Sequence, residues 1–237
     1  MTTFHGLIQK NIVNANLQFE KLGYITNNIS NQNTTAYKSV SFEQVLSEDG
    51  YLSGVLRKDY RPAVLMITDN KFDMGINGQG FFPVTSPEGD VKYTRDGAMM
   101  QNKEGYLVTR DGYLVGDGIK LPINYDNWWI KSNGDVEVSM KYGDKPQKIG
   151  TIPIVNFQNP EGLKALDGNK FIPTEDSGEP VLVVNHDRIE QQKLEVANVD
   201  MISDSNKVMR LNASMLASFQ LVKTINDLYS KSINLQS

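Results

Sequence analysis

Both ends of the chain carry apolar side chains at helical spacing, and this pattern constrains the fold most. Over residues 4–31 the apolar positions recur at steps of three and four, which keeps one face of a helix apolar; they are Ile8, Ile12, Ala15, Phe19, Leu22, Ile25 and Ile29. Residues 199–233 carry a stripe close to a heptad repeat: Ile202, Met209, Leu216, Phe219, Val222, Tyr229 and Ile233. Such faces must be buried, against the other chain end or neighbouring copies.

The middle of the chain is rich in turn signals and short strand-like runs. Three Asp-Gly pairs follow one another at residues 96–97, 111–112 and 117–118. Asp-Gly supplies the positive φ angles that tight hairpins need. We therefore predict a β-rich region over residues 72–190. Within it, the adjacent Trp128 and Trp129 are expected to be one core and one rim tryptophan.

These patterns predict an α+β fold in which both chain ends form a discontinuous, coiled-coil-like helical module around an inserted, mainly β domain. The expected divisions are an N-terminal helix (1–32), a linker with short elements (33–71), the β domain (72–190) and a C-terminal helix (191–237). The first helix should end near residues 29–32, where Asn, Ser and Thr side chains compete for the backbone. The second should begin near Asn198 or Asp200, either of which can act as N-cap.

Composition narrows the function classes. The chain has 237 residues, of which 39% are hydrophobic and 22% charged, so it can bury a core. A net charge of −4 without a long basic run makes nucleic acid a poor partner. The absence of cysteine excludes disulfides and thiolate metal sites. No signal-peptide pattern and no run of about 18 apolar residues is present, so we expect no membrane span.

Few residues suggest catalysis. The two histidines, His5 and His186, lie far apart in the sequence and form no metal-binding motif, so we expect no metal and no cofactor. The Gly75–Gly80 run lacks phosphate-loop spacing and predicts tight bends. Arg95 either holds a carboxylate or is an ordinary solvated or salt-bridged residue. We expect no enzymatic activity, although a carboxylate-only hydrolytic site or a ligand-binding site within residues 72–190 stays open as an alternative.

Four short motifs follow one another along the chain. Their residues are Asn27, Asn28, Asn31, Thr34, Tyr37 and Lys38; Gly78, Gly80, Phe81 and Phe82; Tyr93, Thr94, Arg95, Asp96 and Gly97; and Leu194, Glu195, Asn198, Val199 and Asp200. In content and order these motifs resemble those of the bacterial flagellar rod and hook proteins. The chain departs from that family's pattern at Ala36 and Gln192, where the family favours Gly, and at Ala197, where it has Ser.

The resemblance implies a structural subunit of the flagellar basal-body rod, proximal or distal, and the brief segment between Lys38 and Phe72 favours the proximal type. A hook- or junction-type axial protein is the alternative. The terminal helices would self-assemble into the tubular drive shaft, with the β domain facing outward. The implied partners are copies of the chain, other rod and hook subunits, and surrounding ring proteins. The implied location is the periplasm-spanning rod, reached by type III export through the flagellum's own channel without a cleaved signal peptide.

The two helical stripes then have separate expected roles. The first stripe would pair the two terminal helices with each other, and its residues other than Ala15 are also the expected assembly interface. A second stripe would meet neighbouring copies: Met201, Val208, Leu211, Met215, Leu221, Ile225 and Leu228. Because that surface is exposed before assembly, we expect disordered ends in the isolated monomer.

Overall fold

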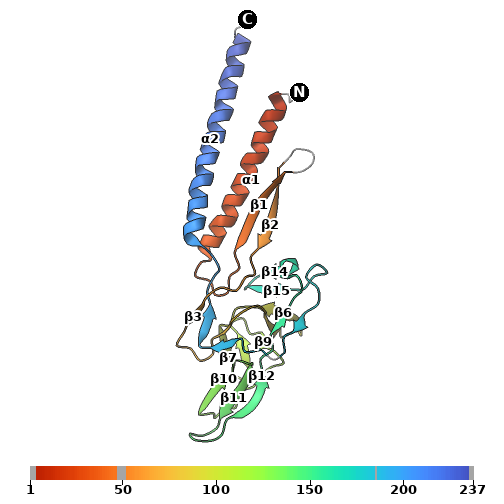
Figure 1. Cartoon of the computed structure of the whole chain (residues 1–237), viewed down its shortest axis with the longest axis vertical. Coiled ribbons are helices and arrows are strands. Elements are labelled where there is room, and N and C mark those ends of the chain that lie inside the picture. Colours follow the sequence, from red (N-terminus) through yellow and green to blue (C-terminus); the bar gives the residue numbers. More distant parts are fainter. Residues whose placement is uncertain (1–3, 47–51, 185, 235–237) are drawn as a thin grey trace. The chain divides into compact units, whose positions relative to one another are not determined.

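The computed structural model describes residues 4–46, 52–184 and 186–234, and these divide into two compact units (Figure 1). Unit 1 contains the described residues among 1–31, 39–58 and 199–237. Unit 2 contains those among 32–38 and 59–198. Each unit is therefore built from segments that lie far apart in the sequence. The combination of terminal helices and a mainly β middle confirms the α+β class.

Unit 1 pairs two long helices, α1 (Phe4–Ser30) and α2 (Met201–Asn234), which run side by side (Figure 1). The expected ends are confirmed. At the end of α1 the Asn31 amide donates to the Asn27 carbonyl at 3.1 Å. At the start of α2 the Asp200 carboxylate caps the helix by accepting the Ser203 amide proton at 3.0 Å. Neither helix, within its described residues, has an apolar stretch of the length that a membrane span requires.

An antiparallel hairpin, β1 (Val40–Leu46) with β2 (Leu52–Lys58), completes unit 1. We expected only a linker with short elements here, so this hairpin was missed. Phe42 is its one buried side chain and stacks on Tyr24 of α1, with ring centroids 5.8 Å apart. Asn28 adds a paired contact, because its side chain accepts from the Val40 amide and donates to the Val40 carbonyl, both at 2.9 Å. With one buried residue, the strands show no alternation that the sequence could reveal.

Unit 2 is mainly β. Its largest sheet has the strand order β14-β15-β6-β5-β9-β8-β7, and β10-β11-β12 form a second sheet. Three pairs complete it, β13-β16, β17-β4 and β18-β3. The strands are β3 (Leu65–Ile67), β4 (Met74–Ile76), β5 (Phe82–Thr85), β6 (Val91–Thr94), β7 (Met99–Gln101), β8 (Leu107–Thr109), β9 (Leu114–Val115), β10 (Asn127–Ile130), β11 (Asp135–Ser139), β12 (Gln147–Thr151), β13 (Val155–Asn156), β14 (Lys164–Leu166), β15 (Lys170–Ile172), β16 (Val181–Leu182), β17 (Ile189–Gln191) and β18 (Lys193–Glu195), with a short 3₁₀ helix at Pro160–Gly162.

Two apolar clusters form the core of unit 2. The larger one brings together mainly aliphatic side chains from eight strands and includes Trp128, against which Phe72 packs. The smaller one is aromatic: Phe81 meets Phe157 and Phe171 edge to face, with ring centroids 5.6 and 5.7 Å apart. Trp128 is 2% exposed and Trp129 is 39% exposed, which confirms the predicted core and rim pair.

The three Asp-Gly pairs do not share one role. Gly112 and Gly118 have the positive φ angles predicted for tight turns, 85° and 84°. Gly97 instead allows two backbone segments to touch: a Cβ built on it would lie 1.5 Å from the Met74 carbonyl oxygen. The Met74 amide donates to the Gly97 carbonyl at 3.0 Å, which fixes this approach. The hairpin-turn prediction is therefore wrong for the pair at residues 96–97.

This close approach makes a stability prediction. Gly97→Ala should lower the free energy of unfolding of unit 2 by at least about 3 kcal/mol, because the new methyl group must displace backbone rather than a flexible side chain. Gly89→Ala is the control for steric contact: Gly89, unlike Gly97, has a positive φ, and nothing lies within 4 Å of its Cβ direction. It should cost only about 1–2 kcal/mol of backbone strain. Urea unfolding followed by tryptophan fluorescence measures both, and equal losses would contradict the steric argument.

Candidate functional site

The first candidate site is the apolar surface of the helix pair in unit 1. Large apolar residues are exposed on α1 and α2; they are Ile12, Phe19, Met201, Ile202, Met209, Leu216, Phe219, Leu221 and Leu228. We call these residues the outer helix face. Leu216 is 64% exposed and Ile202 is 78% exposed, values far above those of a packed seam. About half or more of each of these residues is exposed, so this surface is available to a neighbour.

The sequence-based assignment of the two stripes is wrong for α2. Ile202, Met209, Leu216 and Phe219 were expected to pair with α1 but are exposed. The less exposed positions of α2 belong to the second stripe, where Met215 is buried and Val208, Leu211 and Ile225 are partly buried. In the first stripe, Ile25 is buried and Ala15, Leu22, Ile29 and Val222 are partly buried. The side chains of Ile8, Tyr229 and Ile233 lie outside those that the structure describes.

Polar residues explain the reversal. The buried helix side chains include Gln18, Asn28 and Asp204, which we call the inner polar set. The Gln18 amide donates to the Ser214 hydroxyl at 3.2 Å, and the Asn28 amide donates to the Asp204 carboxylate at 3.5 Å. The pairing of these polar groups across the helices decides which side of α2 faces α1. The spacing of apolar residues does not show which side this is. The helix pair thus buries three polar side chains beside Ile25 and Met215 and leaves large apolar residues exposed.

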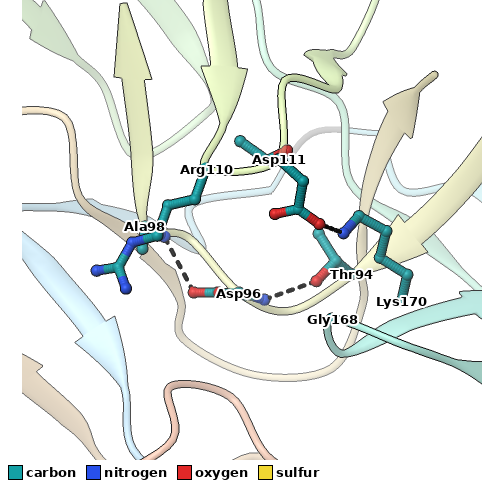
Figure 2. Close-up of a pocket in the computed structure, with 8 residues that line it drawn as sticks. Thr94, Asp96, Ala98, Arg110, Asp111, Gly168 and Lys170 are labelled. Carbon is teal, nitrogen blue, oxygen red and sulfur yellow. Dashed lines mark hydrogen bonds and ion pairs between the residues drawn. The ribbon is translucent and has the colours of Figure 1, made fainter. Parts of the chain in front are cut away.

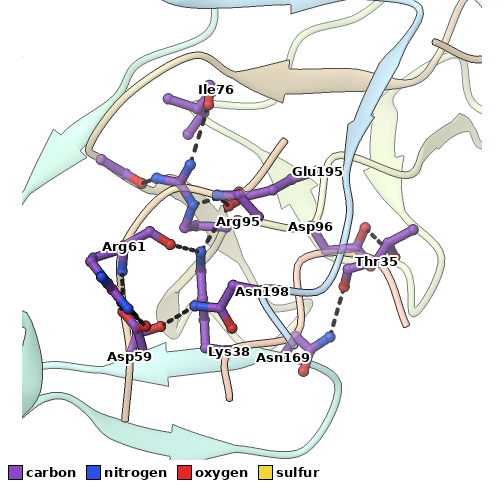
Figure 3. A network of polar contacts seen from close by, with 12 residues as sticks. Thr35, Lys38, Asp59, Arg61, Ile76, Arg95, Asp96, Asn169, Glu195 and Asn198 are labelled. Atoms are coloured by element: carbon purple, nitrogen blue, oxygen red, sulfur yellow. Dashed lines mark hydrogen bonds and ion pairs between the residues drawn. The ribbon is translucent and has the colours of Figure 1, made fainter. Parts of the chain in front are cut away.

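The second candidate site is a buried ion cluster in unit 2 where the sequence motifs converge (Figure 3). Glu195 of β18 accepts from Lys38 at 2.7 Å and from Arg95 at 2.6 Å. Its carboxylate also accepts the Ala63 amide proton at 2.7 Å. The three charged side chains are 0% (Lys38), 1% (Arg95) and 0% (Glu195) exposed. We call Lys38, Arg95 and Glu195 the Glu195 cluster.

Two buried cations share one buried carboxylate, so backbone carbonyls must satisfy the remaining donors. Lys38 donates to the Arg61 carbonyl at 2.7 Å, and Arg95 donates to the carbonyls of Gly80 and Ile76 at 2.6 and 3.2 Å (Figure 3). Burial lowers the pKa of Lys38, and the Glu195 carboxylate opposes that shift. Lys38 can therefore lose its charge, whereas an arginine cannot. Arg95 is the cation that depends most on Glu195.

Hydrogen bonds also connect the motif around residue 36 to Glu195 and to Asp96, the residue after Arg95. The Ala36 amide donates to the Glu195 carbonyl at 2.8 Å, and the Thr35 hydroxyl donates to Asp96 at 2.9 Å. Burial raises the pKa of Asp96, against hydrogen bonds from Ala98 and Thr35. Ala36 has a φ of 54° and Gln192 one of 57°. Both positions, where the family favours Gly, thus keep a left-handed backbone, at a strain of about 1–2 kcal/mol each.

The remaining motif residues have local roles. Gly78 and Gly80 form bends with φ angles of 119° and 130°, as predicted for this run. Phe81, Phe82, Tyr93, Thr94 and Leu194 are buried in unit 2, and Gly97 makes the close approach described above. Asn27 lies in the last turn of α1, and Asn31 and Thr34 lie in the turn after it. Asn198 hydrogen-bonds to Asp59 and Tyr37, and Val199 and Asp200 lead into α2. Sequence reasoning listed these residues without showing that Lys38, Arg95 and Glu195 meet. The one available signal was that three of the four motifs carry charged residues, among them Lys38, Arg95 and Glu195.

A small pocket lies beside this region (Figure 2). Its volume is about 10 Å³, and its lining residues are Thr94, Asp96, Ala98, Thr109, Arg110, Asp111, Gly168 and Lys170. Lys170 is buried and forms an ion pair with Asp111, and its ammonium lies 4.6 Å from the centroid of the Tyr113 ring. A volume of this size holds about one water molecule. The pocket therefore gives no support to the ligand-binding or hydrolytic alternative.

Comparison with known proteins identifies the class. Residues 75–138, the centre of unit 2, match the family model described as flagellar hook protein FlgE/F/G D1 domain. This part of the chain is thus similar to the D1 domain of flagellar hook and rod proteins, as the motifs indicated.

Relatives along almost the whole chain are more specific. The flagellar basal-body rod protein FlgG of Agrobacterium fabrum is 30% identical over 90% of this chain and 92% of its own length. FlgG of Caulobacter vibrioides is 28% identical with the same coverage. The flagellar basal-body rod protein FlgF of Mesorhizobium japonicum is 28% identical over 80% of both chains. The chain belongs to the family of flagellar basal-body rod proteins and is a structural rod protein.

We predict that the charged residues of the Glu195 cluster contribute unequally to the stability of unit 2. Glu195→Gln should lower the free energy of unfolding of unit 2 by about 3–5 kcal/mol, because Arg95 is left buried without a counter-charge. Lys38→Met should cost at most about 2 kcal/mol, since Glu195 keeps Arg95 and the Ala63 amide as partners. Both tryptophans lie in unit 2, so fluorescence during urea unfolding reports on this unit. Equal losses in the two variants would show that the cations are equivalent.

Proposed function

We propose that the chain is a rod subunit that assembles with copies of itself, and with other rod and hook subunits, through the outer helix face. Its location would be the flagellar basal body, in the rod that spans the periplasm, with export that leaves the N-terminus uncleaved. Surrounding ring proteins are candidate partners of the β domain. The names of the relatives, basal-body rod proteins, support a structural and non-enzymatic role.

The observation that carries this proposal is the distribution of polar and apolar residues on the helix pair. Three of the five buried side chains on the described helix surfaces are polar, namely the inner polar set, while nine large apolar side chains form the outer helix face. A helix pair that functioned alone would place these groups the other way round. Burying each outer residue against a neighbour would contribute about 1.5–3 kcal/mol. Coiled-coil-like packing among the terminal helices of adjacent copies would provide that burial.

A hook- or junction-type role stays the alternative within the same family, because the D1 match covers hook and rod proteins together. Electron cryotomography of a flagellated host lacking the gene separates these roles. A rod subunit predicts basal bodies truncated at the rod, without hook or filament. A hook or junction subunit predicts a complete rod that lacks the structures beyond it.

Leu216→Asp tests the outer helix face directly. It should raise the protein concentration needed for assembly at least about 100-fold, since it removes a buried leucine and would bury a charge. Thr224→Asp, which adds the same charge at an exposed polar position of α2, is the matched control. Sedimentation measures assembly, and tryptophan fluorescence confirms that unit 2 stays folded. Assembly of Leu216→Asp at the parent concentration would rule out this face.

Hydrogen exchange of the monomer tests the state of unit 1 before assembly. The amides of α1 and α2 should exchange rapidly compared with those of unit 2, because the inner polar set stabilises the pair weakly and the outer helix face is uncovered. Polymerised protein should protect the same amides. Strong protection of both helices in the monomer would show that the ends are ordered without neighbours.

A further inference from the structure

The chain passes between its two units four times, after residues 31, 38, 58 and 198. Because the chain is continuous, a force that separates the units is carried along the backbone at these crossings. On the side of unit 2, three of these crossings lie close together in space. Lys38 precedes the second crossing, Asp59 follows the third, and Asn198 precedes the fourth. What holds these three ends therefore decides how unit 2 responds to tension.

Short polar contacts hold the three ends together (Figure 3). Asn198 donates through its side chain to the Asp59 carbonyl at 2.7 Å and through its amide to the Tyr37 carbonyl at 3.2 Å. One step further in, Lys38 bridges the Arg61 carbonyl and Glu195, both at 2.7 Å. The Glu195 cluster is thus the next set of contacts inward from the hydrogen bond between Asn198 and Asp59.

The direction of loading makes this position important. Strands β3 and β18 are antiparallel, with Leu65 opposite Glu195 and Ile67 opposite Lys193. Asp59 and Asn198 lie at the same open end of that ladder. Tension on these two ends therefore loads one contact at a time, starting from Asp59–Asn198, instead of loading all rungs together. Two-stranded ladders of three residue pairs resist such opening weakly.

We propose that the Glu195 cluster and Asn198 form a tension-bearing anchor, which keeps unit 2 from opening at its chain crossings when the two units are pulled apart. Opening would separate Glu195 from two buried cations, and that leaves charges without partners in a region closed to water. The cluster also joins β18 to Arg95, the residue after β6 of the large sheet. A force applied at Asn198 is therefore shared between β3 and the large sheet. The proposal concerns unit 2 alone and holds whether or not the outer helix face mediates assembly.

Optical tweezers on the full chain test the anchor. Because the chain has no cysteine, Gln44→Cys in β1 and Asn206→Cys in α2 give unique attachment points for DNA handles. Both positions are exposed and lie in unit 1, on either side of unit 2 in the sequence. The event of interest is the one that releases the part of unit 2 between Asp59 and Asn198, identified from the length gained.

Two variants separate a mechanical role from general stability. Asn198→Ala should raise the rate of that event at fixed force about ten-fold, because it removes the first contact in the loading path. Val136→Ala, in the core strand β11 and far from the crossings in the sequence, should lower the urea midpoint more but change the forced rate less than about two-fold. Glu195→Gln should raise the rate at least about 100-fold, and if it does not fold, Asn198→Ala decides. An Asn198→Ala rate within two-fold of the parent, or a faster Val136→Ala, would overturn the proposal.

Discussion

The buried carboxylate of Glu195 is the interaction on which unit 2 depends. The carboxylate pairs with Lys38 and Arg95 and accepts a hydrogen bond from the Ala63 amide. The backbone carbonyl of Glu195 accepts a hydrogen bond from the Ala36 amide. Removing water from three charges is costly, and the cost is offset only while every partner is present. The residues that meet there are separated by 100 and 157 positions in the sequence. The cluster therefore requires that the β domain and both flanking segments fold as one body.

Much of this architecture could be predicted from the sequence, and the parts that could not share a cause. Helix ends were predictable because Asp200 and the Asn-rich run act on their own local backbone. The Trp128 and Trp129 pair was predictable because alternation along a strand is local too. The β1–β2 hairpin was missed because it buries only Phe42, which leaves no alternating pattern. Gly97 was misassigned because its partner, Met74, touches it through space and not along the chain.

The candidate sites divide in the same way. Apolar spacing identified the stripe of α2 that includes Leu216 but paired it with α1, because spacing does not show that Asn28 and Asp204 decide which side of the helix α1 covers. A period shows that a stripe exists and does not show what lies against it. The motifs marked Lys38, Arg95 and Glu195 individually. Their meeting depends on strand order in unit 2, which one sequence does not reveal.

The adjacency of Asp59 and Asn198 has a consequence for how such a protein can change over generations. A segment whose entry and exit lie side by side can be exchanged for a longer or shorter one, as long as the replacement also begins and ends at neighbouring points. Selection could then enlarge or shrink the β domain while the terminal helices keep their sequence. One pair of terminal helices would thus accommodate β domains of different size, with the contact between residues 59 and 198 kept unchanged.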